Sequence, residues 1–275
     1  MLKGKKLAVI GVGKLGEALI SGLLNQGDLK IGDIAGSVAH ESSIARVREH
    51  LGIETSVDNK KLVQGKDLII LAVKPQNMDK VAREISDVVK PHQLVITVAA
   101  SVTTEYIQER LKEKVAVVRA MPNTPAVINC GMTGLCAGSL ATPEHMDLAE
   151  SVFKCVGETV RVDESLMDGV TALSASGPAY FYVVIESLAE AGVKLGIPSE
   201  TAKLLAAQTM LGSARMVLQS KSHPAVLKDM VTTPAGCTID GLLELEEGKL
   251  RVTLIKAVVK AAERARELVT SQNSK

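Results

Sequence analysis

The sequence predicts an α/β protein whose first half forms a doubly wound, mostly parallel sheet and whose second half is all-helical. From Lys6 to about Val162, short runs of Val, Ile and Leu alternate with segments of helical period, which is the pattern of parallel strands buried on both faces by crossover helices. After Asp163 the strand-like runs stop, and Ala-rich and Leu-rich stretches follow. We therefore expect two domains, 1–163 and 164–275, which suits a chain of this length with 46% hydrophobic residues.

Each expected strand is a short apolar run bounded by turn-forming residues. The expected strands are Lys6–Ile10, Lys30–Ala35, Glu54–Val57, Asp67–Ala72, Leu94–Val98, Val115–Arg119 and Thr159–Val162, with Met132–Ala137 as a further candidate. The expected helices of the second half are Pro178–Leu195, Pro198–Gln219 and Arg251–Thr270. The first two carry small or apolar residues around most of their circumference, so we expect a second subunit to bury them.

Composition excludes several functional classes. The 32 basic and 31 acidic residues leave a formal charge of +1 with no basic block, so no nucleic-acid partner is expected. The longest apolar runs, such as Leu68–Val73, are too short to cross a bilayer, and we expect neither a membrane partner nor a targeting peptide. The four cysteines lack C-x-x-C spacing and the five histidines lack ligand spacing, which indicates a cytoplasmic protein without a metal site.

A glycine-rich turn follows the first expected strand and opens a helix. It reads Gly11-Val12-Gly13-Lys14-Leu15-Gly16 and matches G-x-G-x-x-G in the context that the motif requires. Gly11 would permit the tight turn, Gly13 would let the backbone approach a pyrophosphate, and Gly16 would allow close helix packing. The helix N-terminus attracts phosphate. These residues are expected to bind a dinucleotide, and a glycine-rich turn without ligand is the alternative.

The region about 20 residues beyond the glycines indicates which dinucleotide. NAD-binding domains commonly have an acidic residue there that accepts hydrogen bonds from the ribose, whereas this chain has Gly36-Ser37. We expect Asp33 to lie inside the strand and Gly36-Ser37 to form a small uncharged loop that holds a 2′-phosphate, helped by Ser37, Lys14 or Arg46. NADPH is therefore the expected cofactor, with NADH possible.

Loops at the ends of later strands would meet the nicotinamide half, because ligands of open α/β sheets bind at the carboxyl ends of strands. They contain Ala72-Val73-Lys74-Pro75, Ala99-Ala100-Ser101 and Met121-Pro122-Asn123-Thr124-Pro125. Taken singly, Lys74 and Asn123 are equally well interpreted as a solvated charge and a turn former. The further residues expected to bind cofactor are thus Asn59, Ala72, Val73, Lys74, Pro75, Ala99 and Asn123.

A second candidate site is the turn of small residues Thr233-Pro234-Ala235-Gly236-Cys237-Thr238, which leads into a helix predicted over Ile239–Glu247. Such a turn presents unpaired backbone N–H groups at the positive end of the helix dipole and suits a carboxylate. The alternative is an ordinary cap by Thr238, worth about 1 kcal/mol. Gly236 is expected to need a positive φ. Cys237 is not expected to be a nucleophile, since no histidine pairs with it in sequence.

Five motifs occur in an order and spacing that resemble the pyrroline-5-carboxylate reductase family, and the resemblance covers essentially the whole chain. They are the Gly11 loop, Ala72–Gln76, Arg119–Pro125, Leu173–Tyr180 and the segment His223–Glu246, whose run from His223 to Thr238 is the most specific part. The resemblance implies an α/β fold with an N-terminal Rossmann-like doubly wound sheet plus a C-terminal all-helical dimerisation domain. It also implies reduction of the cyclic imine 1-pyrroline-5-carboxylate to proline and assembly of five dimers into a decamer.

The same resemblance assigns roles within the small-residue turn. Thr233 and the backbone of Gly236, Cys237 and Thr238 would hold the substrate carboxylate. The Thr238 hydroxyl would reach the ring nitrogen, which makes Thr238 the candidate catalytic residue.

Three positions depart from the commonest family pattern. Ala235 and Ser101 stand where many members have glycine, and Lys221 stands where some relatives have an acidic residue. The first two are interpreted as small-for-small changes. Lys221 puts in doubt any carboxylate contact to the substrate amine from that position.

Two alternative functions are compatible with the sequence. A dehydrogenase of the β-hydroxyacid type also joins such domains, with Lys194 or Lys203 as the candidate acid or base. A non-catalytic NADP-sensing scaffold would keep the fold and lose turnover, but the intact Thr233–Thr238 turn favours an enzyme.

Overall fold

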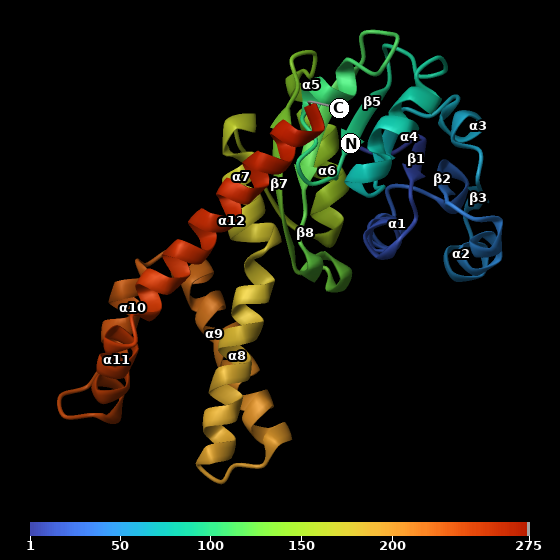
Figure 1. The fold of residues 1–275 in the computed structure, drawn as a ribbon. Helices are drawn as coiled ribbons and strands as arrows, with labels where there is room; N and C mark the ends of the chain where they lie inside the picture. Colours follow the sequence, from blue (N-terminus) through green and yellow to red (C-terminus); the bar gives the residue numbers. More distant parts are fainter. Residues whose placement is uncertain (274–275) are drawn as a thin grey trace. The chain divides into compact units, whose positions relative to one another are not determined.

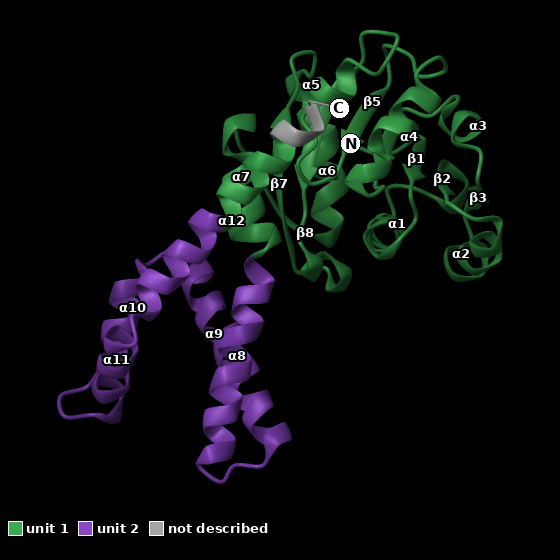
Figure 2. Ribbon diagram, in the orientation of Figure 1, with its two compact units in different colours: residues 1–176, 261–275 green, residues 177–260 purple. Residues whose placement is uncertain are grey.

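The computed structural model describes residues 1–273 of the chain, and side chains as far as residue 269. The described chain forms two compact units. Unit 1 contains residues 1–176 and the last part of the chain from Ala261, and unit 2 contains residues 177–260 (Figure 2).

Unit 1 is built on one eight-stranded sheet with the order β3-β2-β1-β4-β5-β6-β7-β8 (Figure 1). All neighbouring strands are parallel except β6 and β7, which run antiparallel. The first six positions are those of a doubly wound dinucleotide-binding sheet, in which the order reverses between β1 and β4. This confirms the predicted fold class. The strands are β1 Leu7–Ile10, β2 Ile34–Ser37, β3 Glu54–Ser56, β4 Leu68–Leu71, β5 Leu94–Thr97, β6 Ala116–Met121, β7 Gly131–Ala137 and β8 Gly157–Arg161.

Apolar side chains on both faces of this sheet explain why helices cover it on both sides. Along β1, Leu7 and Val9 belong to one buried cluster, and Ala8 and Ile10 belong to the other, as the two-residue period of a strand requires. Helices α1 and α6 contribute to the first cluster, and α4 and α5 contribute to the second. The helices of unit 1 are α1 Lys14–Gln26, α2 Ile44–Leu51, α3 Asn59–Val63, α4 Met78–Ile85, α5 Thr104–Gln108, α6 Pro143–Phe153 and α7 Met167–Val170.

One predicted strand, Lys30–Ala35, is displaced along the chain. Residues Ile31–Asp33 form a 3₁₀ turn, in which Asp33 Oδ2 accepts a hydrogen bond from the Lys30 N–H at 2.9 Å. The strand therefore begins only at Ile34 and ends at Ser37. A carboxylate that caps a turn locally competes with strand pairing, so Asp33 precedes the strand instead of lying inside it.

The compact units also divide the chain differently from the predicted boundary between Asp163 and Glu164. The segment after Asp163 stays with the sheet because Met167, which is fully buried, packs against Met121 and Cys136. The end of the chain returns to unit 1 as well, where the Ser101 hydroxyl donates a hydrogen bond to the Ala265 carbonyl at 3.4 Å.

Unit 2 is all-helical, and α8 packs against α9. Its helices are α8 Gly177–Lys194, α9 Ser199–Ser220, α10 Pro224–Met230, α11 Cys237–Glu247 and α12 Leu250–Asn273, of which α12 continues into unit 1. Ala202 and Ala206 of α9 are buried, whereas many large apolar side chains of this unit are exposed. Within the described residues, no helix combines the length and hydropathy that crossing a membrane requires.

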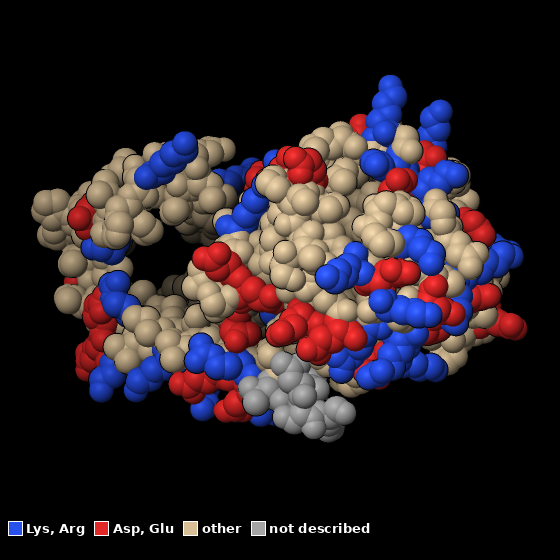
Figure 3. All heavy atoms as spheres, turned by 90° about the horizontal axis from the view of Figure 1, so that it is seen from above, with Lys and Arg blue, Asp and Glu red and all other residues tan. Residues whose placement is uncertain are grey.

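Charged side chains are spread over the surface in both signs. On the face shown in Figure 3, Lys and Arg lie side by side with Asp and Glu over much of the area. The mixture of both signs on this face agrees with the formal net charge of +1.

Candidate dinucleotide and substrate sites

The turn between β1 and α1 has the backbone geometry that the glycine motif predicts. Gly11 has a φ of +95°, and a Cβ added there would lie 2.8 Å from the Ala72 carbonyl oxygen. A Cβ added at Gly16 would lie 2.9 Å from the Gly11 carbonyl oxygen. Only glycine therefore fits at either position. An added Cβ at Gly13 would have no atom within 4 Å, and Gly13 is exposed at the N-terminus of α1, so ligand can approach the backbone there.

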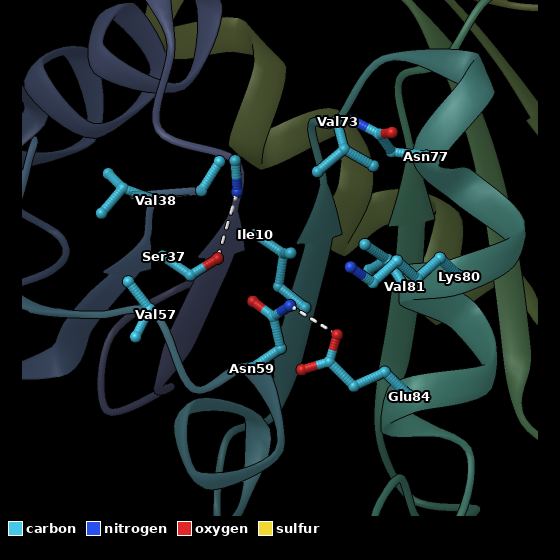
Figure 4. Close-up of a pocket in the computed structure, with 12 residues that line it drawn as sticks. Ile10, Ser37, Val38, Val57, Asn59, Val73, Asn77, Lys80, Val81 and Glu84 are labelled. Atoms are coloured by element: carbon cyan, nitrogen blue, oxygen red, sulfur yellow. Dashed lines mark hydrogen bonds between the residues drawn. The ribbon is translucent and has the colours of Figure 1, made fainter. Parts of the chain in front are cut away.

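A pocket of about 430 Å³ lies beside this turn, at the carboxyl ends of β1 and β2 (Figure 4). This is the crevice where the strand order reverses, which is the usual ligand site of doubly wound sheets. The pocket is lined by Ile10, Gly11, Ser37, Val38, Ala39, Val57, Asn59, Val73, Asn77, Lys80, Val81 and Glu84.

Four residues predicted from the sequence to bind cofactor line this pocket, namely Gly11, Ser37, Asn59 and Val73. The Ser37 hydroxyl accepts a hydrogen bond from the Gly11 N–H at 3.3 Å. The Asn59 amide donates to Glu84 Oε2 at 3.0 Å. The end of β2, the glycine turn and α3 therefore lie together at one edge of the sheet.

The expectation that Gly36 and Ser37 form a loop is wrong, because both lie in β2. A Cβ added at Gly36 would lie only 2.6 Å from Val12 Cγ2, so Gly36 packs beneath the glycine turn and does not face ligand. Arg46, expected near a 2′-phosphate, instead forms an ion pair with Glu17 at 2.6 Å.

The remaining predicted cofactor residues do not line the pocket. Val12 is buried, Lys14, Leu15 and Gly16 form the first turn of α1, and Ala72, Lys74 and Pro75 follow β4. Ala99 is buried beyond the end of β5. Asn123 holds its surroundings together, because its Oδ1 accepts from the Met132 N–H at 2.9 Å and its Nδ2 donates to the Ser174 carbonyl at 3.3 Å.

Sequence reasoning missed the contribution of α4. Asn77, Lys80, Val81 and Glu84 all line the pocket, although none belongs to a strand-end motif. The available signal was the i,i+4 spacing of Lys80 and Glu84, which places both on one face of a helix. The packing of α4 against the sheet determines which of its residues reach the pocket. Its buried side is formed by Met78, Val81, Ala82 and Ile85.

In unit 2, the small-residue turn before α11 differs in detail from the prediction. Ala235 takes the positive φ, +55°, whereas Gly236 has a φ of −82° and is the N-cap of α11. The Gly236 N–H donates to the Thr233 carbonyl at 3.0 Å, which closes the turn. A Cβ added at Gly236 would lie 2.4 Å from Thr233 Oγ1. A side chain at Gly236 would therefore have to displace the Thr233 hydroxyl, whereas the backbone conformation there does not require glycine.

The first turn of α11 presents free donors. Among the described residues, neither the Cys237 nor the Thr238 backbone N–H has a hydrogen-bond acceptor, and no side chain caps this helix end. The alternative of an ordinary cap by Thr238 is therefore wrong. Two unpaired amides at the positive end of an 11-residue helix form a local anion-binding geometry.

The four cysteines differ in exposure, with Cys136 buried and Cys155 half-buried. Burial raises the pKa of the Cys136 thiol to about 12, with Glu164 as a secondary cause, and burial likewise raises the pKa of Cys155 to about 12. Cys130 and Cys237 are exposed. In the described part of the chain, no group of three or more His, Cys, Asp or Glu residues is arranged to hold a metal ion.

The strand order, the glycine turn and the pocket at the point of reversal define a dinucleotide-binding protein with a separate helical unit. Two family models match the chain. "NADP oxidoreductase coenzyme F420-dependent" matches residues 6–101, and "Pyrroline-5-carboxylate reductase dimerisation" matches residues 164–268.

Similar proteins extend over the full length. The pyrroline-5-carboxylate reductases of Methanosarcina acetivorans and Escherichia coli are 42% and 37% identical to this chain, and each match covers 97% of this chain and 99% of the relative. The Coxiella burnetii pyrroline-5-carboxylate reductase structure has a TM-score of 0.90 at 36% identity, covering 96% of this chain and 98% of that one. A Plasmodium falciparum pyrroline carboxylate reductase with NADP bound has a TM-score of 0.86 at 29% identity, covering 97% and 99%. The chain belongs to the pyrroline-5-carboxylate reductase family.

Proposed function

We propose that this protein reduces 1-pyrroline-5-carboxylate to L-proline, the last step of proline biosynthesis, with NADPH as the hydride donor. The full-length identity of about 40% to curated reductases supports the reaction. The observation that carries the proposal within the chain is the pair of free amides at Cys237 and Thr238, in the turn that the family resemblance assigns to the substrate.

The residues of unit 1 fit the cofactor. The open Gly13 backbone at the N-terminus of α1 suits the pyrophosphate, and the pocket beside Ser37 and Asn59 suits the adenosine end. Lys74, Ala99 and Asn123 follow β4, β5 and β6, and their proposed role is to contact the nicotinamide half. When bound, NADPH supplies a hydride, and the protein's task is to orient the imine carbon and exclude competing reactions.

The substrate is an anion with a ring nitrogen that is cationic when protonated. Hydride adds to the imine carbon, the C=N π electrons become the nitrogen lone pair, and the ring nitrogen of proline keeps the proton. The Cys237 and Thr238 amides would hold the carboxylate, with Thr233 and the backbone at Gly236 shaping the turn. The Thr238 hydroxyl would contact the ring nitrogen, but a hydroxyl with an ordinary pKa is a poor acid at neutral pH, so its proposed role is to orient the imine.

The family model for residues 164–268 describes a dimerisation domain, and the protein is a homodimer on that basis. We propose that five dimers form a decamer. A cytoplasmic location also stays a prediction. The β-hydroxyacid alternative loses support, because Lys203 is paired with Glu200 at 2.9 Å on the exposed face of α9.

The direct test is NADPH oxidation on addition of 1-pyrroline-5-carboxylate, with proline measured as product. Thr238→Ala is expected to lower turnover by roughly 10-fold to 100-fold, because the imine nitrogen loses a polar partner. Thr232→Ala is the matched control, since the Thr232 hydroxyl is already bonded to the Lys228 carbonyl at 2.9 Å. NADPH affinity should be unchanged in both. No proline formation by the wild-type protein would refute the proposed reaction, and equal turnover of both variants would refute the role of Thr238.

A further inference from the structure

We infer that Lys80 is the residue that makes the enzyme prefer NADPH over NADH, by binding the 2′-phosphate of the adenosine ribose. The inference rests on the proposed function, because it names the group in the dinucleotide pocket that recognises one cofactor. It starts from the charges of the residues that line that pocket.

The end of β2 has no carboxylate for a ribose diol. Ser37, Val38 and Ala39 line the pocket there, and Asp33 lies before the strand, where it caps a turn by accepting from the Lys30 N–H. A carboxylate at this strand end would bind the two ribose hydroxyls of NADH and repel a 2′-phosphate. The end of β2 therefore lacks the carboxylate that selects NADH.

Lys80 is the only cation among the described residues that line the pocket. Figure 4 shows its side chain reaching from α4 toward the pocket interior. Of the other two candidates for phosphate binding, Arg46 is paired with Glu17, and Lys14 does not line the pocket. A lysine ammonium binds phosphate as a point charge, so Lys80 is the residue placed to do so.

The ammonium of Lys80 is kept available by a neighbouring contact. Glu84 lies one helical turn further along α4, at the spacing where a Lys–Glu pair is usual. Glu84 instead accepts a hydrogen bond from Asn59 at 3.0 Å (Figure 4). Among the described residues, Lys80 forms no ion pair or hydrogen bond through its side chain. Asn59 thus holds the pocket's one carboxylate and leaves its one cation free for a ligand phosphate.

The test compares Lys80→Met, Lys80→Arg and the matched control Lys90→Met, whose lysine is exposed and lies outside this pocket. We expect kcat/KM for NADPH to fall at least about tenfold in Lys80→Met, as for loss of a charge-assisted hydrogen bond. The same constant for NADH should change less than about twofold. Lys80→Arg should keep the preference for NADPH, and Lys90→Met should match the wild type.

Binding of adenosine 2′,5′-bisphosphate and of AMP, measured by calorimetry, separates this inference from the proposed reaction. Weaker binding of the bisphosphate alone in Lys80→Met supports the inference even if 1-pyrroline-5-carboxylate is not turned over. Equal losses for NADPH and NADH would overturn it and make Lys80 a general adenosine contact. Unchanged constants for both cofactors would also overturn it, while leaving the reductase function intact.

Discussion

The two units contain similar apolar residues but differ in how far the single chain buries them. In unit 1, the central strands β1, β4 and β5 are almost completely buried by the unit's own helices. In unit 2, Leu204, Leu211 and Leu218 of α9 lie seven residues apart, hence on one face of the helix, and are 67%, 45% and 75% exposed in the single chain. A sheet with helices on both faces completes its own core, whereas a helical unit with an uncovered apolar face requires a partner.

The largest expected effect is on dimer stability, when a charge is placed on the exposed apolar face of α9. Leu211→Glu removes from each of two subunits one leucine that we expect the dimer to bury, worth about 2 kcal/mol each, so the dimer should dissociate roughly 1,000-fold more readily. Light scattering over a range of protein concentrations measures this. Leu140→Glu, at an exposed apolar position of unit 1, is the matched control and should leave the mass unchanged. A Leu211→Glu protein that keeps its full mass at low concentration would show that this face is not an interface.

The next largest expected effect is on the unfolding free energy of unit 1, which should not depend on protein concentration. Arg119 is 2% exposed, and its Nη1 lies 3.6 Å from Glu164 Oε1. Glu164 also accepts hydrogen bonds from the Thr104 N–H at 2.8 Å and the Thr104 hydroxyl at 2.6 Å. Glu164→Ala leaves a buried cation unpaired and should cost about 3 kcal/mol of unfolding free energy.

Urea unfolding followed by circular dichroism measures this loss, with exposed Glu158→Ala as the control. Replacing both partners, as Arg119→Met with Glu164→Leu, should recover much of the stability. A loss as large in the double variant as in Glu164→Ala would mean that the Thr104 contacts, not the unpaired cation, explain the effect.

A smaller effect concerns pH and the surface of unit 1. Hydrogen bonds from Arg161 and then Lys154 lower the pKa of Glu150 to about 2. A folded pKa below the ordinary value of 4.5 means that the stabilisation is complete above pH 4.5 and is lost as pH falls toward 2. Because Arg161 is 41% exposed, screening reduces the contribution to about 1 kcal/mol. Glu150→Gln should lower stability at pH 7 and flatten its acid dependence, as measured by unfolding at several pH values; an unchanged slope would contradict the assignment.

The smallest effect compares two strained residues, one in each unit. Ala235 and Ser101 have φ values of +55° and +61°, a backbone conformation that favours glycine. Ala235→Gly should stabilise the protein by about 0.5 kcal/mol, because relief of the left-handed conformation outweighs the added chain entropy. Ser101→Gly should be nearly neutral, since it also loses the hydrogen bond to Ala265. Thermal unfolding of both variants measures the difference, and equal shifts would argue against this account.

The positive φ values correct one interpretation drawn from the sequence. The changes at Ser101 and Ala235 look like exchanges of one small residue for another, and size is indeed conserved. Backbone conformation is not visible in residue size, so the strain at both positions became apparent only from the folded chain.

The sequence alone determined the parts of this protein that depend on local pattern. The strand runs other than Lys30–Ala35, the glycine turn with its position at the head of α1, and the apolar helices of the second half are confirmed. These features follow from hydrophobic period and from glycine chemistry, which act over a few neighbouring residues. The order and spacing of the sequence motifs likewise predicted the family, which the comparisons confirm.

Only the tertiary structure determined which residues from distant segments of the chain contact one another. In the folded chain, Lys80 and Glu84 of α4 lie in the same pocket as the end of β2, and Glu84 accepts a hydrogen bond from Asn59. Asp33 lies before β2, although the sequence pattern predicts a strand that begins at Lys30. The tertiary structure also showed that Gly236 closes its turn through Thr233 and leaves the next two amides free. These outcomes depend on which side chains compete for one partner across the fold, and that competition exists only when strands and helices far apart in sequence are packed against each other.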